Sequence, residues 1–224
     1  MSSFRSAVEC GANGLETDVR RTKDGVLVLC HDKTLSRLQG REDAVADLTL
    51  EELRAVPVKN GEKEDVVPTL EEFLSEFADT ELILALELKA PDIEKDVLDA
   101  VRRHGLERRV EITSFKLEYL ENVRRLDPVF RTGFLAKKDA ITPALLSRMR
   151  EAGIDQICPP AAAITSREDT VRTHALGFRV RCWGVSSAEE MRRLVLAGVD
   201  GMTFNWPDQL VAYQKAIYPP VPEE

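Results

Sequence analysis

The chain has 224 residues, which is enough for one large domain or two small ones. Its net charge is −8 and only 6% of its residues are aromatic, so it has neither the basic surface nor the stacking platform of a general nucleic-acid-binding protein. The hydrophobic fraction of 43% is enough for a sizeable core, which excludes general disorder.

No apolar run approaches the roughly 18–20 residues that a transmembrane helix needs, and the N-terminus has no apolar signal-peptide segment. The four cysteines are far apart and form no CxxC pair. Cys30 and Cys182 lie in apolar, strand-like runs, so we expect reduced, buried thiols and no zinc site. These features predict a cytoplasmic protein.

The first elements are predicted to be a helix and a hairpin. The helix is expected over 2–10, and the strand over 14–20 follows a glycine-bracketed turn. The sequence Thr22-Lys23-Asp24-Gly25 is typical of a turn. Residues 26–30 are therefore expected to return beside the first strand as its hairpin partner.

The next segment, 33–68, is polar and is predicted to be irregular apart from one short helix over 49–56. Another helix is expected over 69–78. Each of these helices starts with a threonine followed three residues later by a glutamate, which is the capping-box pattern. The pairs are Thr49 with Glu52 and Thr69 with Glu72.

From residue 82 onward, short apolar runs alternate with amphipathic stretches, which is typical of βαβ units. The predicted barrel-type strands are 14–20, 82–88, 109–113, 129–135, 154–158, 179–184 and 199–203. Helices are expected over 91–104, 116–126, 142–152, 166–176, 186–197 and 207–217. We therefore predict a single α/β domain over 1–218 and a flexible tail over 219–224.

Seven strands are one short of the eight in a TIM (β/α)8 barrel. Because the chain starts with a helix, the missing strand would be the first one, before Met1. An open doubly wound sheet tolerates any number of strands and is the alternative, but no Gly-rich phosphate loop supports it. The fold prediction is a TIM barrel that lacks its first strand in this chain.

Carboxylates gather on the inner faces of two predicted strands. Because strand side chains alternate, Glu16 and Asp18 share one face of the first strand. If the leucines of 82–88 face the helices, Glu87 and Lys89 face the barrel interior. Three carboxylates in a small cavity repel one another and are costly to desolvate. A divalent cation with oxygen ligands, Mg²⁺ or Ca²⁺, would resolve this, although charged strand ends are also common without an ion.

His31 directly follows the apolar run 26–30. That position lies at the C-terminal end of a strand, where barrel enzymes keep their chemistry. A histidine there can transfer protons near neutral pH, although for this residue taken alone a structural histidine that caps a turn is the favoured interpretation. His104 and His174 each lie at the C-terminal end of a predicted helix, shortly before a glycine. A cationic side chain there complements the helix dipole, which indicates structural roles.

The ordered motifs of the chain resemble those of glycerophosphodiester phosphodiesterases. The matching segments are Gly14-Leu15-Glu16-Thr17-Asp18-Val19, Val28-Leu29-Cys30-His31-Asp32, Pro68-Thr69-Leu70-Glu71-Glu72, Leu86-Glu87-Leu88-Lys89, Ser114-Phe115, Gly133-Phe134-Leu135, Trp183 and Gly198-Val199-Asp200-Gly201. Each motif alone is weak, but the ordered set is specific and covers nearly the whole chain.

The resemblance implies a TIM barrel that hydrolyses a small-molecule glycerophosphodiester to glycerol 3-phosphate and an alcohol. It implies that Glu16, Asp18 and Glu87 hold a divalent metal ion, Mg²⁺ or Ca²⁺. It also implies that His31 is one of two catalytic histidines and that Lys89 and Trp183 bind the substrate. The alcohol and the oligomeric state are not predicted.

The chain also departs from the family pattern. The family opens with a strand ending in His-Arg-Gly, which carries the other catalytic histidine and a phosphate-binding arginine, and this segment would lie before Met1. We therefore expect the chain to be a truncated part of a longer protein. The alternatives to a metal-dependent phosphodiesterase, complete or truncated, are a degenerate barrel that binds a phosphodiester or metal without turnover and an unrelated sugar-phosphate barrel. The latter would need a phosphate-binding glycine loop, but Ser186-Ser187-Ala188 has no glycine.

Overall fold

The computed structural model describes residues 1–55, 57–60, 63–137 and 140–217. The predicted tail over 219–224 lies outside these residues. The strands are β1 (Gly14–Arg21), β2 (Leu27–Leu29), β3 (Val58–Asn60), β4 (Lys63–Asp65), β5 (Ile83–Leu88), β6 (Val110–Ser114), β7 (Arg131–Leu135), β8 (Gln156–Cys158), β9 (Arg179–Cys182) and β10 (Gly201–Met202). The helices are α1 (Ser2–Glu9), α2 (Ser36–Gln39), α3 (Leu50–Arg54), α4 (Leu70–Glu76), α5 (Glu94–Arg103), α6 (Leu117–Leu126), α7 (Pro143–Glu151), α8 (Arg167–Ala175), α9 (Ala188–Ala197) and α10 (Pro207–Ile217).

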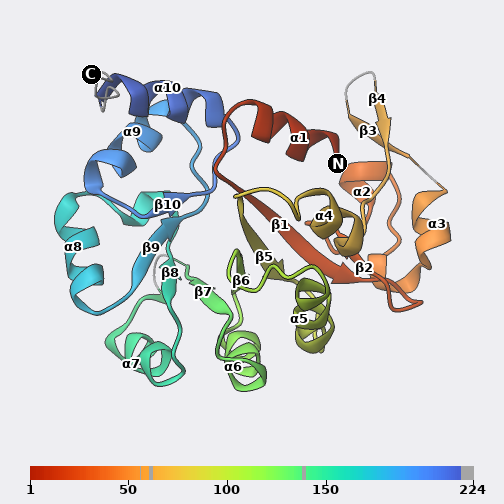
Figure 1. The fold of residues 1–224 in the computed structure, drawn as a ribbon, viewed down its shortest axis with the longest axis horizontal. Coiled ribbons are helices and arrows are strands. Elements are labelled where there is room, and N and C mark those ends of the chain that lie inside the picture. The colour runs from red at the N-terminus through yellow and green to blue at the C-terminus, as the bar shows by residue number, and fades with distance from the viewer. Residues whose placement is uncertain (56, 61–62, 138–139, 218–224) are drawn as a thin grey trace.

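The main sheet curves into an α/β barrel with its helices on the outside (Figure 1). Its strand order is β10-β9-β8-β7-β6-β5-β1-β2. The seven strands from β1 to β10 that were predicted for the barrel are parallel and sequential, and β2 is antiparallel to the end of β1. The predicted barrel with seven strands is confirmed, as is the hairpin.

The strands at the two ends of the parallel set do not pair with each other among the described residues. In the part of the chain that the structure describes, β10 pairs only with β9, and β2 covers β1 only from Val19 onward. The β1 end and the β10 end of the sheet are instead connected through contacts between helices and loops. Gly11, just after α1, lies next to Val211 of α10, and its φ of +88° suits a residue without a Cβ atom.

The core forms because one face of each strand is apolar. Leu84, Leu86 and Leu88 of β5 are buried with the apolar faces of α5 and α6. Helices α3 and α4 begin where the capping-box pattern of the sequence predicts. Thr49 and Thr69 accept hydrogen bonds from the backbone N–H three residues later, and both capping boxes are complete. Within the described chain, every helix is too short or too polar to span a bilayer.

The segment 33–68 contains more structure than predicted. It includes α2, a 3₁₀ turn at Val45–Asp47 and the hairpin of β3 and β4. Its scattered apolar residues pack with the end of β2 into a second small core made of Val28, Cys30, Leu35, Val45, Leu48, Leu53 and Val67. These residues have no regular spacing, so the sequence pattern alone did not show that they bury one another.

Other differences are small. The last two barrel strands are shorter than predicted, because β9 ends at Cys182 and β10 contains only Gly201 and Met202. Cys30, Cys158 and Cys182 are buried free thiols, whereas Cys10 is exposed. The buried thiols predicted at positions 30 and 182 are therefore confirmed.

Candidate active site

Three carboxylates from two adjacent strands meet at the C-terminal mouth of the barrel. β1 and β5 pair in parallel, with Asp18 opposite Glu87 in the ladder. Glu16 lies one inward position earlier on β1. One carboxylate oxygen from each residue lies within 4.8 Å of the others. The structure thus brings together the three residues that the sequence analysis selected as metal ligands.

Lys89, one residue past β5, joins this group as predicted. Its Nζ lies 2.8 Å from Glu87 Oε1 and 3.2 Å from Asp18 Oδ1. Although burial lowers the pKa of Lys89, the hydrogen bond to Glu87 and the negative charges of Asp18 and Glu87 outweigh it and raise the pKa. The ammonium therefore stays charged and partly neutralises the carboxylates.

Burial at the mouth raises the pKa values of two of the carboxyl groups, Glu16 and Glu87. Burial, with a further contribution from the Asp18 charge, raises the pKa of Glu16 to about 7. Burial also raises the pKa of Glu87 to about 7, against the opposing effect of Lys89. The cost of desolvating several like charges is the physical cause of both shifts.

This arrangement fits a divalent cation. All three donors are carboxylate oxygens, which Mg²⁺ and Ca²⁺ prefer. The three carboxylate oxygens lie within 4.8 Å of one another, so one ion with metal–oxygen distances of about 2–2.5 Å can reach all of them. Lys89 already places one positive charge against two of the donors.

His31 follows β2 at the same end of the barrel. Its side chain is 64% exposed, and its Nδ1 lies 2.7 Å from Asp32 Oδ1. Asp32 also accepts a hydrogen bond of 2.6 Å from Arg37 Nε. A carboxylate at Nδ1 fixes the tautomer and leaves Nε2 to carry the exchangeable proton.

The backbone connects His31 to the carboxylates. The Cys30 N–H donates to the Asp18 carbonyl at 3.0 Å, and the Lys89 N–H donates to the Val19 carbonyl at 3.1 Å. Residues 30–31 and residue 89 are thus both attached to the end of β1. Arg20 adds side-chain hydrogen bonds to the same two segments.

An aromatic pair lies beside Lys89. Trp183, after β9, contacts Phe115, after β6, with ring centroids 5.4 Å apart in an edge-to-face arrangement. Lys89 Nζ lies 5.7 Å from the centroid of Phe115. The Trp183 indole N–H donates to the Ala136 carbonyl at 3.3 Å, which fixes the ring. Trp183 is therefore near the predicted site, and Phe115 joins it to Lys89.

A cavity of about 410 Å³ extends from this site between β1 and the end of the sheet at β9 and β10. Glu16 and Arg181 both line it. Arg181 donates to Thr203 Oγ1 at 2.8 Å and to Gln156 Oε1 at 3.2 Å. The positive charge of Arg181 acts on Glu16 and lowers its pKa, opposing burial and the Asp18 charge.

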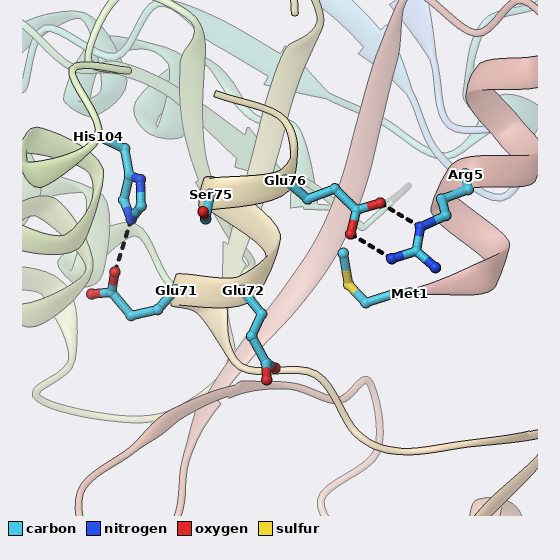
Figure 2. A pocket seen from close by; sticks show the side chains of 7 residues that line it. All are labelled: Met1, Arg5, Glu71, Glu72, Ser75, Glu76 and His104. Atoms are coloured by element: carbon cyan, nitrogen blue, oxygen red, sulfur yellow. Dashed lines mark hydrogen bonds and ion pairs between the residues drawn. The ribbon is translucent and has the colours of Figure 1, made fainter. Parts of the chain in front are cut away.

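A second hollow lies outside the barrel, between α1 and α4 (Figure 2). Four of its titratable side chains are already paired with one another, and Glu72 pairs with Arg54 outside the hollow. Arg5 makes two hydrogen bonds to Glu76, at 2.5 and 2.7 Å, and His104 Nε2 lies 2.8 Å from Glu71 (Figure 2). Because these groups satisfy one another, the hollow offers few free polar groups for a ligand.

The sequence analysis did not name Phe115, Arg20, Asp32 or Arg181 as site residues. The position of Phe115 directly after a predicted barrel strand could have indicated a site residue, because barrel enzymes place their functional residues there. In the structure its side chain is 37% exposed, which is unusual for a large aromatic residue. The parity rule that selected Glu16 and Asp18 also places Arg20 on the same face of β1. Nothing local in the sequence indicates the position of Arg181 beside Glu16.

The fold and the site together define an α/β-barrel protein with an acidic, metal-compatible mouth. Comparison with known proteins agrees with this class. Residues 1–209 match the model of the glycerophosphoryl diester phosphodiesterase family. A glycerophosphodiester phosphodiesterase of Caldanaerobacter subterraneus subsp. tengcongensis is 32% identical over 220 residues, covering 94% of this chain and 89% of that protein. One from Bacillus altitudinis is 28% identical and covers 97% of this chain and 92% of its own length.

Solved structures show the same fold. A crystal structure from Silicibacter pomeroyi, assigned to the glycerophosphoryl diester phosphodiesterases, has a TM-score of 0.88 and 27% identity, covering 97% of this chain and 88% of that one. A glycerophosphodiester phosphodiesterase of Parabacteroides distasonis has a TM-score of 0.78 and 25% identity, covering 96% and 89%. The chain belongs to the glycerophosphoryl diester phosphodiesterase family.

Proposed function

We propose that this protein hydrolyses glycerophosphodiesters to glycerol 3-phosphate and an alcohol, using a divalent metal ion held by Glu16, Asp18 and Glu87. The observation that carries the proposal is the meeting of these three carboxylates beside Lys89, at the mouth of a barrel of this family. When bound, such an ion polarises a nonbridging phosphoryl oxygen and offsets the charge that develops on it.

The remaining residues have roles that follow from their positions. Lys89 lies at the mouth of the barrel, where its ammonium group can bind an anionic phosphate. His31, oriented by Asp32 through Nδ1, can give or take a proton at Nε2. Trp183 and Phe115 offer an apolar surface beside Lys89, where the carbon atoms of a glycerol group can lie.

Metal binding can be tested without measuring activity. We expect Mg²⁺ or Ca²⁺ to raise the melting temperature of the protein, because an ion that binds only the folded state stabilises it. Glu16→Gln is expected to remove this gain. The matched control is Glu118→Gln, which alters an exposed carboxylate on α6 and is expected to keep the gain. No shift with either ion would contradict the proposed metal site.

Turnover is tested by the release of glycerol 3-phosphate from glycerophosphocholine in the presence of the metal. His31→Ala is expected to lower kcat by about 10²–10⁴-fold, the usual value of a general acid or base. His104→Ala is the control, because His104 also lies 2.8 Å from a carboxylate but outside the barrel mouth. Binding of glycerol 3-phosphate with no turnover above the His31→Ala background would favour the degenerate, binding-only alternative instead.

A further inference from the structure

Arg20 makes an unusual set of hydrogen bonds at the mouth of the barrel. Its side chain lies on the same face of β1 as Glu16 and Asp18. It donates through Nε to the Cys30 carbonyl at 3.1 Å, through Nη2 to the His31 carbonyl at 2.8 Å and through Nη1 to the Lys89 carbonyl at 3.3 Å. One guanidinium therefore joins the segment after β2 to the segment after β5.

These carbonyls need a donor from outside the sheet. They belong to residues just past the C-terminal ends of two strands, where the regular ladder stops. A guanidinium is planar and rigid and presents several N–H donors in a fixed fork. Because all three nitrogens of Arg20 are used, the distance between the His31 and Lys89 backbones is set by the dimensions of that fork. A flexible lysine ammonium could not impose the same spacing.

The next residue provides an internal comparison. Arg21 lies on the opposite face of β1 and also connects this strand to the segment after β5. It donates to the Asp92 carbonyl at 2.9 Å and pairs with Asp96 of α5. Two consecutive arginines thus make similar links, one inside the candidate site and one outside it.

We propose that Arg20 is a positioning residue that holds the catalytic His31 at a fixed distance from the phosphate-binding Lys89. This inference rests on the proposed function, since it assigns His31 and Lys89 to one reaction. Three of the five N–H donors of Arg20 bond backbone carbonyls. In this proposal Arg20 acts through the two residues that it connects.

The main experiment compares Arg20→Gln with Arg21→Gln in the glycerophosphocholine assay. Displacing a reacting group by about 1 Å costs on the order of 10²-fold in rate, so we expect kcat of Arg20→Gln to fall by about 10–100-fold with a smaller change in KM. Arg21→Gln is expected to stay within about threefold of the wild type, because its contacts lie outside the mouth. Arg20→Lys should retain an intermediate rate.

Chemical rescue separates positioning from general loss of stability. Guanidinium chloride, at concentrations far below the denaturing range, is expected to restore part of the activity of Arg20→Ala, because the free ion can occupy the vacated position. The same salt should have no such effect on Arg21→Ala. Equal kcat values for Arg20→Gln and Arg21→Gln, or the absence of rescue, would overturn the inference.

Hydrogen exchange tests the link independently of turnover. In Arg20→Gln, amide exchange in the segment 30–34 is expected to rise, whereas in Arg21→Gln it should stay at the wild-type level. If the wild type hydrolyses no glycerophosphodiester, the proposed function fails while this measurement still tests the connection made by Arg20. Unchanged exchange over 30–34 in Arg20→Gln would show that Arg20 does not hold this segment.

Discussion

At the scale of single residues, the site is governed by competition between protons and cations for the same carboxylates. Glu16 and Glu87 both have pKa values raised to about 7 by burial, and Glu87 already faces Lys89. A divalent ion binds the ionised forms only. Protons therefore compete with the ion as the pH falls through about 7.

This competition predicts a pH-dependent metal affinity. We expect the gain in melting temperature with Mg²⁺ or Ca²⁺ to be larger at pH 8 than at pH 6, because at pH 6 the metal must displace protons from Glu16 and Glu87. Titration calorimetry in two buffers with different ionisation enthalpies measures the protons released. An affinity that is the same at both pH values, with no proton release, would contradict these raised pKa values.

At the scale of elements, β1 carries most of the site because one of its faces packs in the apolar core and the other presents polar side chains to the mouth of the barrel. Leu15 and Val19 are buried in the core, whereas Glu16, Asp18 and Arg20 line the mouth. Elsewhere, polar side chains connect one element to the next. Asp200, just before β10, accepts a 2.7 Å hydrogen bond from the Val180 N–H of β9 and lies 2.8 Å from His174 Nε2 of α8.

The Asp200 link predicts a pH-dependent stability. Burial raises the pKa of Asp200, but the hydrogen bonds from Val180 and His174 outweigh it and lower the pKa. Since the folded-state pKa is below the unfolded value of about 3.9, the stabilisation is present above that value and is lost as the pH falls through the folded pKa. We expect Asp200→Asn to cost about 1–2 kcal/mol at pH 7.

Urea unfolding between pH 3 and 7 measures this effect. The difference between wild type and Asp200→Asn should shrink below pH 4, since the wild-type carboxylate is then being protonated. Asp79→Asn alters an exposed aspartate in the loop after α4 and is the control. A difference that stays constant across the pH range would show that the charge of Asp200 does not contribute.

At the scale of the whole molecule, the interior strands of the parallel sheet and its β10 edge differ in the support that they receive from neighbouring elements. β5 and β6 lie between neighbours on both sides, and every residue of β6 is buried. β10 contains two residues, both partly exposed, and pairs only with β9 among the described strands. No side chain of α10 is fully buried. The region of β10 and α10 therefore has weaker local support than β5 and β6.

We expect amide hydrogen exchange to follow this gradient. Amides of β5 and β6 should exchange slowest, through global unfolding, whereas those of β10 and α10 should exchange through local opening of lower free energy. Exchange mass spectrometry measures both regions in one experiment. Equal protection of β10 and β6 would contradict the gradient and would mean that further contacts support β10.

The sequence by itself determined the features that depend on local periodicity. Alternating faces placed Glu16 with Asp18 and Glu87 with Lys89, and the threonine–glutamate spacing located the starts of α3 and α4. These predictions succeed because side-chain direction and helix capping depend on residues a few positions apart. The family motifs then added the expected reaction and the expected roles of His31 and Trp183.

Only the tertiary structure decided the contacts between distant segments. The parallel register that sets Asp18 opposite Glu87 joins residues far apart in the chain, and no local pattern fixes that distance. The same holds for the pairing of Phe115 with Trp183 and for the three carbonyls around Arg20. Such contacts arise from the packing of strands and helices against a shared core, which depends on the whole sequence at once.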